Sequence, residues 1–183
     1  MGVKPFIRWA GSKRQLLSQL RAYIPETIKT YHEPFMGSAC LFFDLQPERA
    51  VLSDVNRALV ETFEQVKLHP KDVHDFLGRL EPTSDFYYAV RGFDDSALTP
   101  PERAGRFIYL MRYGYGGVYR TNMEGRFNVP FGNLSTGQLP GLEHLEAAAA
   151  CLANTELKCT DFANALEIVG EGDFVYLDPP YAT

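Results

Sequence analysis

The stretch Phe174-Val175-Tyr176-Leu177-Asp178-Pro179-Pro180-Tyr181 decides the fold class. Four apolar or aromatic residues precede a charged residue and two prolines, which is the pattern of a buried strand that ends at a rigid polar turn. A helical pattern at 163–169 and a strand pattern at 157–160 come before it. Strand, helix and strand in alternation are typical of an α/β domain, with a parallel sheet and helices on both faces.

The same alternation fills the first 69 residues. The sequence predicts strands at 31–35 and 50–53 and helices at 12–23, 38–45 and 56–67. Helices at 71–80, 84–91 and 101–113 then interrupt it, followed by a Gly- and Tyr-rich stretch and a helix at 140–152. We therefore expect one α/β domain from residues 1–69 and 141–183. Residues 70–140 would form a mainly helical insertion with a hairpin near 113–132.

Composition fits a folded domain of this size. The chain has 183 residues, of which 45% are hydrophobic and 22% charged, and this argues against wholesale disorder. No stretch approaches the roughly 20 apolar residues of a membrane span, and the first residues lack the apolar core of a signal peptide. We expect a cytoplasmic protein. Cys40, Cys151 and Cys159 have no metal-like spacing, so we expect free thiols and no metal.

The net charge of −5 hides two basic segments. Residues 1–21 hold five Lys or Arg residues and no acid, and residues 103–131 hold five Arg residues against Glu124. Such segments can form a surface that faces phosphates, even on an acidic chain. Two solvated helix faces would explain them equally well.

Three polar clusters follow predicted strands. They are the segment Pro34-Phe35-Met36-Gly37, the single residue Asp54, and Asp178 to Tyr181. In parallel sheets, ligands bind just beyond the carboxyl ends of the strands. The shared placement predicts that the three clusters build one site.

The Asp-Pro-Pro-Tyr cluster suits chemistry on an exocyclic base amine, whose lone pair is delocalised into the ring. The Asp178 carboxylate and the Pro179 carbonyl can each accept a hydrogen bond from one N–H group of the amine, which frees that lone pair. Pro179 and Pro180 fix the direction of the carbonyl, and Tyr181 offers a face on which a flipped base can stack. Positioning and electrostatics would then supply most of the rate, without a covalent enzyme intermediate. A rigid turn that only closes the strand is the structural alternative.

With these clusters placed, the chain resembles the DNA adenine-N6 methyltransferase family of the D12 class. The resemblance runs from Lys4 to Tyr181 and rests on four segments: 4–13, 33–43, 53–56 and 112–132. It implies a Rossmann-like sheet, S-adenosylmethionine as methyl donor without a metal, and double-stranded DNA as partner. Housekeeping, phage and restriction-modification roles all stay open.

The resemblance also implies a cofactor-binding set at the strand ends. Its members are Trp9, Lys13, Phe35, Gly37, Asp54, Asp161, Phe162 and Asp178. Trp9 and Lys13 would line the methionine portion with its carboxylate. Asp54 would accept hydrogen bonds from the ribose hydroxyls, and Asp161 and Phe162 would lie beside the cofactor's adenine.

Segments 112–120 and 127–132 resemble the family's DNA-contacting hairpin, where the DNA-binding residues would be Tyr115, Val118, Tyr119, Arg120, Asn128 and Pro130. Tyr115 or Tyr119 would wedge into the base stack where the target adenine leaves it. Arg120 would read guanine through its O6 and N7 atoms. Val118 and Pro130 would contact a thymine methyl group. Family members that recognise GATC share this hairpin pattern, which with Arg120 and Pro130 makes that target plausible. A hairpin that merely packs its aromatic side chains is the alternative.

Two positions depart from the family's pattern. Phe35 and Gly37 would let the backbone approach the cofactor closely, but Ala39 stands where many relatives carry a second glycine. Gly116 stands where relatives place an asparagine that can hold the orphaned partner base.

The sequence stops at Thr183, where relatives continue with further strands and helices. The strand at 174–177 would then be a sheet edge, and edges invite association. We expect a truncated chain that could self-associate through this edge, and three interpretations remain: a product with little activity, one half of a split enzyme completed by another chain, or an active fragment. Beside the leading interpretation stand an inactive module that binds cofactor or DNA and a methylase acting on RNA or on cytosine N4.

Overall fold

The computed structural model describes residues 2–132 and 137–179, and within them the strands form one parallel sheet. The sheet order is β3-β2-β1-β4. The strands are β1 (Tyr31–Glu33), β2 (Ala50–Asp54), β3 (Thr155–Cys159) and β4 (Phe174–Val175). This arrangement confirms the predicted α/β class. Pro180 and Tyr181, predicted to be catalytic, lie outside the described residues.

The helices agree with most of the predicted positions. They are η1 (Lys13–Leu16), α1 (Leu17–Leu20), η2 (Arg21–Tyr23), α2 (Cys40–Leu45), α3 (Arg57–Leu68), α4 (Pro70–Leu77), α5 (Ser84–Arg91), η3 (Asp95–Ala97), α6 (Pro100–Tyr113), η4 (Tyr115–Gly117), α7 (Leu142–Leu152) and α8 (Phe162–Leu166). Side-chain caps fix several starts: Asn56 accepts the N–H of Leu59, and Thr99 forms a capping box with Glu102. None of the described helices is long and apolar enough to cross a membrane.

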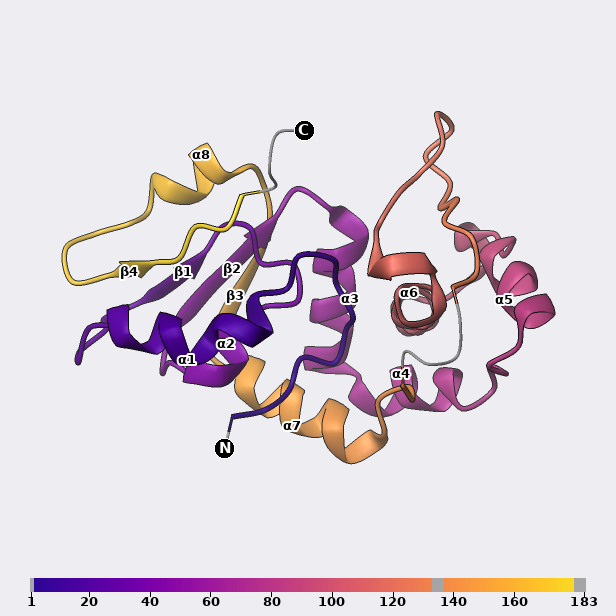
Figure 1. Ribbon diagram of the computed structural model, residues 1–183, viewed down its shortest axis with the longest axis horizontal. Coiled ribbons are helices and arrows are strands. Elements are labelled where there is room, and N and C mark those ends of the chain that lie inside the picture. Colours follow the sequence, from indigo (N-terminus) through magenta and orange to yellow (C-terminus); the bar gives the residue numbers. More distant parts are fainter. Residues whose placement is uncertain (1, 133–136, 180–183) are drawn as a thin grey trace.

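Helix α3 joins the two halves of the molecule. In Figure 1 the sheet fills one half, helices α4 to α6 fill the other, and α3 lies between them. Its buried side chains include Leu59, Val60, Phe63 and Val66, which form a stripe at helical spacing. One hydrophobic core runs from the sheet through α3 into α6, where Ile108 is fully buried. The insertion therefore shares its core with the sheet.

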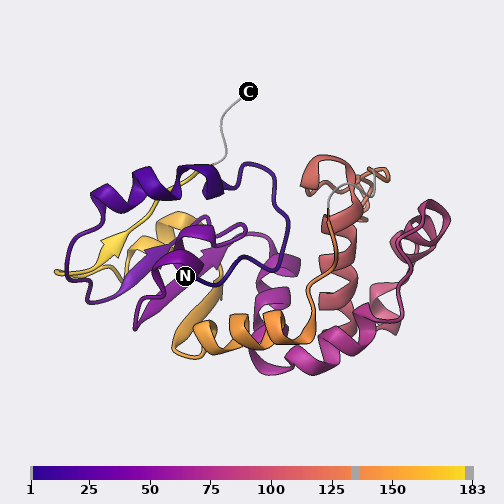
Figure 2. The ribbon, with the colours of Figure 1, turned by 60° about the horizontal axis from the view of Figure 1, so that its bottom comes forward.

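The helix predicted over 12–23 is present as an unbroken but irregular helical segment from Lys13 to Tyr23. The segment forms three short turns, η1, α1 and η2, which lie above the strands in Figure 2, whereas α7 lies below them. None of these turns contains a buried residue. Short helices depend on tertiary packing, and this segment receives too little of it to form one regular helix.

Strand β4 is shorter than predicted and lies at the edge of the described sheet. Its main chain follows β1: the N–H groups of Phe174 and Tyr176 donate to the carbonyls of Thr30 and His32, at 2.9 and 2.8 Å. A buried side-chain contact of 3.1 Å between Nε2 of His32 and Oδ2 of Asp173 supports the strand's start.

The predicted hairpin forms as an antiparallel loop, here called the hairpin loop (residues 114–132). Isolated bridges pair Gly114 with Phe131 and Thr121 with Phe127. The short helix η4 interrupts the outgoing strand, which is why no continuous ladder forms. In Figure 1 the hairpin loop projects upward from the end of α6, on the side opposite to α4.

Candidate active site

The carboxyl ends of β1, β2 and β4 open onto a pocket of about 430 Å³. Seven of the residues predicted from the sequence line it: Trp9, Lys13, Phe35, Gly37, Asp54, Asp178 and Pro179. They come from four separate segments, namely the N-terminal segment, the loop after β1, the end of β2 and the residues after β4. The fold thus brings the three predicted clusters to one place.

An ion pair closes one side of the pocket. Nζ of Lys13 lies 2.6 Å from Oδ1 and 2.7 Å from Oδ2 of Asp178, and it also donates to the Gly11 carbonyl at 3.1 Å. The two side chains are only 18% and 23% exposed, so solvent screens their attraction less than that of a surface pair. Lys13 therefore holds the Asp178 carboxylate in a fixed orientation at the pocket wall.

The loop after β1 needs a glycine at position 37. Its φ of +44° is in the left-handed region, and a Cβ there would lie 2.9 Å from Cδ1 of Trp9. The Gly37 N–H points to Oδ2 of Asp54 at 3.4 Å, and the Asn56 N–H donates to Oδ1 at 3.0 Å. Burial raises the pKa of Asp54, and these N–H groups partly oppose the shift. The carboxylate is thus held at the end of β2 by main-chain donors.

Asp161 and Phe162 lie beside the pocket rather than in its lining. The Phe162 ring, about half exposed, stacks on Phe35 with centroids 5.4 Å apart and planes at 29°. Asp161 caps α8 by accepting the N–H groups of Ala163 and Asn164. The two phenylalanines extend the pocket as an aromatic platform.

The sequence reasoning missed Glu33, which lines the pocket from inside the sheet. This residue is only 3% exposed, and the hydroxyl of Tyr31 donates to its Oε2 at 2.7 Å. Burial raises the pKa of Glu33 to about 8, against the opposing effect of the Tyr31 hydrogen bond. An acidic residue inside a buried strand was the available signal, since Glu is almost never fully buried without a partner.

Residues 9–183 match the family described as D12 class N6 adenine-specific DNA methyltransferase. The chain belongs to this family. It is 34% identical over 189 residues to the type II methyltransferase M1.LlaDCHI of Lactococcus lactis, 35% over 204 residues to M.MjaIII of Methanocaldococcus jannaschii, and 33% over 187 residues to the DNA adenine methylase of Haemophilus influenzae. These matches cover 98–99% of the chain and 66%, 70% and 64% of the respective relatives. The chain therefore spans about two thirds of their length.

In this member of the family, the hairpin loop holds its two candidate wedge residues differently. Tyr119 packs against Trp9, Phe107 and Phe127, with centroid distances of 6.3, 5.5 and 5.9 Å. Tyr115 is 69% exposed. Because Tyr119 belongs to an aromatic cluster, Tyr115 is the ring that the fold leaves accessible. Val118 and Pro130 are also exposed on this loop.

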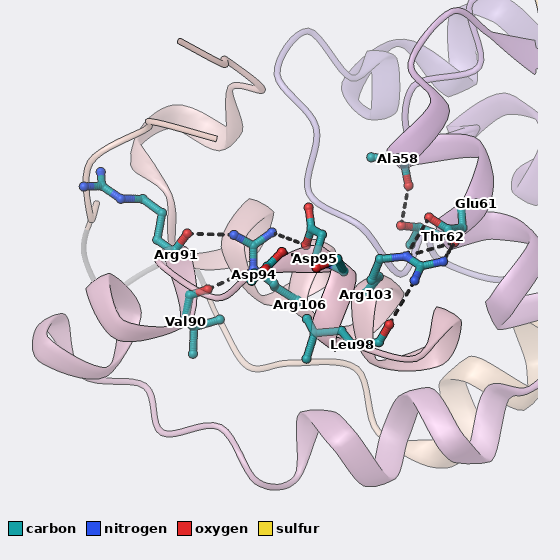
Figure 3. Close-up of polar contacts among 11 residues, drawn as sticks. Ala58, Glu61, Thr62, Val90, Arg91, Asp94, Asp95, Leu98, Arg103 and Arg106 are labelled. Atoms are coloured by element: carbon teal, nitrogen blue, oxygen red, sulfur yellow. Dashed lines mark hydrogen bonds and ion pairs between the residues drawn. The ribbon is translucent and has the colours of Figure 1, made fainter. Parts of the chain in front are cut away.

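Several charges of the two basic segments are used within the methyltransferase fold. Arg103 pairs with Glu61, and Arg106 pairs with Asp95, as Figure 3 shows. Arg106 also donates to the Val90 and Arg91 carbonyls at the end of α5, at 2.9 and 2.7 Å. These arginines stabilise the insertion and are not available to a phosphate.

Arg8 and Arg112 meet at the base of the hairpin loop, and Arg14 acts on Arg112 electrostatically. Arg8 donates to the Gly114 carbonyl at 3.1 Å and to the Arg112 carbonyl at 3.4 Å. Burial lowers the pKa of Arg112, and the positive charges of Arg8 and Arg14 lower it further. The two basic segments thus converge in space at the base of the hairpin loop.

Proposed function

We propose that this chain carries S-adenosylmethionine-dependent methyl transfer to N6 of adenine in duplex DNA. The observation that carries the proposal is the pocket, in which Asp178 and Pro179 lie together with Lys13, Gly37 and Asp54. Membership in an adenine-specific DNA methyltransferase family supports it. The activity is proposed for the protein that contains this chain, since the chain spans about two thirds of its relatives.

The residues present fit the proposed methyl donor. A pocket of about 430 Å³ falls within the usual range for small-molecule sites, roughly 300–1,000 Å³. Asp54 offers a carboxylate for a ribose diol, and Phe35 with Phe162 offers a flat apolar face for a purine. Lys13 and Asp178 present one positive and one negative group to an amino acid zwitterion. When bound, S-adenosylmethionine supplies an electrophilic methyl group on a sulfonium.

The chain's own residues would prepare the amine. The Asp178 carboxylate and the Pro179 carbonyl accept hydrogen bonds from its two N–H groups, which draws the nitrogen's lone pair out of the ring. Lys13 keeps the carboxylate oriented while this occurs. Asp178 can also take the proton that the methylated nitrogen sheds. Tyr181, outside the described residues, would stack on the extruded base.

We also propose a GATC target. Tyr115 is the exposed ring available to fill the gap that the extruded adenine leaves. The Arg120 guanidinium would contact guanine in the major groove, and Val118 and Pro130 would contact the thymine methyl group. All four residues lie on the hairpin loop, next to the basic cluster at its base.

Transfer of a tritiated methyl group to unmethylated duplex DNA tests the proposal. Label should appear on adenine and should protect GATC sites from a methylation-sensitive nuclease. Asp178→Ala should reduce transfer by at least about 10³-fold while DNA binding changes little, because its carboxylate acts at the reacting amine. Label on cytosine, or full activity of Asp178→Ala, would overturn the assignment. Calorimetric binding of S-adenosylmethionine without any label would replace it by a binding module.

A further inference from the structure

Arg120 is held across the hairpin loop by a single residue. Its Nε donates to Oδ1 of Asn128 at 2.8 Å, and its Nη2 donates to the Asn128 carbonyl at 3.3 Å. The Asn128 N–H returns a main-chain bond to the Arg120 carbonyl at 3.1 Å. Three hydrogen bonds therefore join these two residues, two of them made by the guanidinium.

The strand that carries Asn128 is itself fixed to the insertion. The carbonyl of Val129, the next residue, accepts hydrogen bonds from the Tyr87 hydroxyl and from Nη1 of Arg91, both at 3.1 Å. Val129 is only 3% exposed, and Tyr87 is fully buried. Arg120, in contrast, lies on the exposed outgoing strand of the loop. The acceptor therefore lies next to a buried, hydrogen-bonded residue, whereas the Arg120 side chain that it holds is exposed.

The contact with Asn128 uses only one edge of the Arg120 guanidinium. A guanidinium carries five N–H donors in a rigid plane. Asn128 takes the Nε donor and one donor of Nη2, which leaves the end edge formed by Nη1 and the second Nη2 donor. That end edge has the two parallel donors needed for the O6 and N7 atoms of guanine.

We propose that Asn128 is a specificity-determining positioning residue that acts through Arg120. Its amide oxygen and its carbonyl hold the guanidinium so that the end edge faces the major groove before DNA arrives. This inference rests on the proposed function, in which Arg120 reads guanine. It differs from a direct contact between Asn128 and a phosphate, which would add affinity for every sequence alike.

The test compares binding of the full chain to two duplexes, one with GATC and one with AATT in the same flanks, by fluorescence anisotropy. The second duplex keeps the central A·T pairs and removes both guanines. Arg120→Ala should reduce the GATC/AATT affinity ratio by about 10-fold or more. Asn128→Ala should reduce it by about 3- to 10-fold, because a loosely held guanidinium loses part of its preorganisation. Asn128→Asp, which keeps the acceptor oxygen, should retain the ratio even though its charge weakens binding to both duplexes.

A double-mutant cycle separates positioning from other roles. In the Arg120→Ala background, Asn128→Ala should leave the ratio unchanged. Asn122→Ala is the matched control, since Asn122 lies on the same loop and accepts the Arg126 N–H rather than a bond from Arg120; its ratio should equal that of the wild type. If Arg120→Ala lowers the ratio and Asn128→Ala does not, the positioning role is refuted. If the wild type shows no preference for GATC over AATT, or if Arg120→Ala leaves the ratio unchanged, the proposed readout itself fails.

Discussion

Glu33 puts an ionisable group in the interior beside the proposed reaction centre. Its carboxyl is buried, with Tyr31 as hydrogen-bond partner, and Asp178 adds a nearby negative charge that raises the pKa of Glu33 further. With a pKa of about 8, Glu33 holds its proton at neutral pH. The pocket wall is thus less negative than the sequence alone indicates.

This burial has a predictable effect on stability. Between the usual glutamate pKa of 4.5 and the folded value of about 8, the folded state binds more protons than the unfolded state, so the free energy of unfolding falls as pH rises toward 8. In the wild type, the free energy of unfolding should fall by a few kcal/mol over this pH range, at about 1.4 kcal/mol per pKa unit. Glu33→Gln should abolish this fall. Urea unfolding of both proteins at pH 5.5, 7 and 8.5 measures the difference. Parallel pH profiles would show that Glu33 ionises normally.

Ala39 occupies a backbone conformation that favours glycine. Its φ is +50° and its methyl group is fully buried at the start of α2. The family's second glycine would relieve a strain of about 1–2 kcal/mol but lose the buried methyl, worth about 0.8 kcal/mol. The two effects nearly cancel, which accounts for an alanine at this position.

We predict that Ala39→Gly changes the free energy of unfolding by less than about 1 kcal/mol. The matched control is Ala148→Gly, also at 0% exposure but in the middle of α7, which should destabilise by about 1–2 kcal/mol because no strain is relieved. Chemical denaturation compares the two variants. Equal losses at both positions would mean that the left-handed conformation of Ala39 carries no strain.

At the scale of elements, β4 is the least supported strand, yet it leads directly to Asp178. It contains two residues and pairs on one side with β1 within the described sheet. The Asp173 carboxylate accepts the Gly170 N–H at 2.9 Å and contacts His32, so one side chain ties the preceding turn to the neighbouring strand. The position of Asp178 thus depends on a contact five residues upstream.

Asp173→Ala should therefore loosen β4 more than the rest of the sheet. Removing the carboxylate leaves the buried His32 side chain without this contact. Hydrogen exchange at the N–H groups of Phe174 and Tyr176 should accelerate, whereas that of Leu52 in β2 should change less. A uniform increase across the sheet would indicate global destabilisation instead of a local role.

Elements could be predicted where local pattern and packing agree. The predicted helix over 56–67 and the observed α3 differ by one residue at each end, because its apolar stripe faces the core and Asn56 caps it. The helix predicted over 12–23 is present, but its mixture of 3-10 and α turns could not be predicted, because periodicity does not reveal how little the rest of the fold covers a segment.

The candidate site could likewise be predicted only in part. The strand-end clusters could be found from the sequence because their order and spacing are local. The contact between Lys13 and Asp178 joins positions 165 residues apart, and no sequence pattern records such a pairing. The capping role of Asp161 also escaped notice, since a helix start and a ligand contact favour the same residue type.

At the scale of the whole molecule, ion pairing decides which basic residues contribute positive charge to the surface, and their position in the sequence does not. Arg21 forms a bidentate pair with Asp44, whereas Arg14, exposed on the same segment, contributes to the positive potential around Arg112. An acidic chain can thus present a basic surface next to the hairpin loop. DNA should bind across that surface.

The dependence of DNA affinity on salt tests this placement. If Arg14 neutralises one phosphate, Arg14→Ala should reduce the slope of log K against log salt concentration by about 1. Arg21→Ala is the control, because its charge is already paired, and its slope should match the wild type. Anisotropy titrations at four salt concentrations give the slopes. Equal slopes for all three proteins would place the DNA elsewhere.

The shared hydrophobic core limits how sequence preference can be re-engineered. Exchanging the whole of residues 70–140 with a relative would replace side chains such as Ile108 and Tyr109 that pack in the same core as Phe63 of α3. Such chimeras should fail through misfolding rather than through altered recognition. The hairpin loop offers a smaller cassette, since the bridge between Gly114 and Phe131 and the bond from the Gly132 N–H to the Tyr113 carbonyl close its base. New specificities are therefore better sought by grafting within these two boundaries.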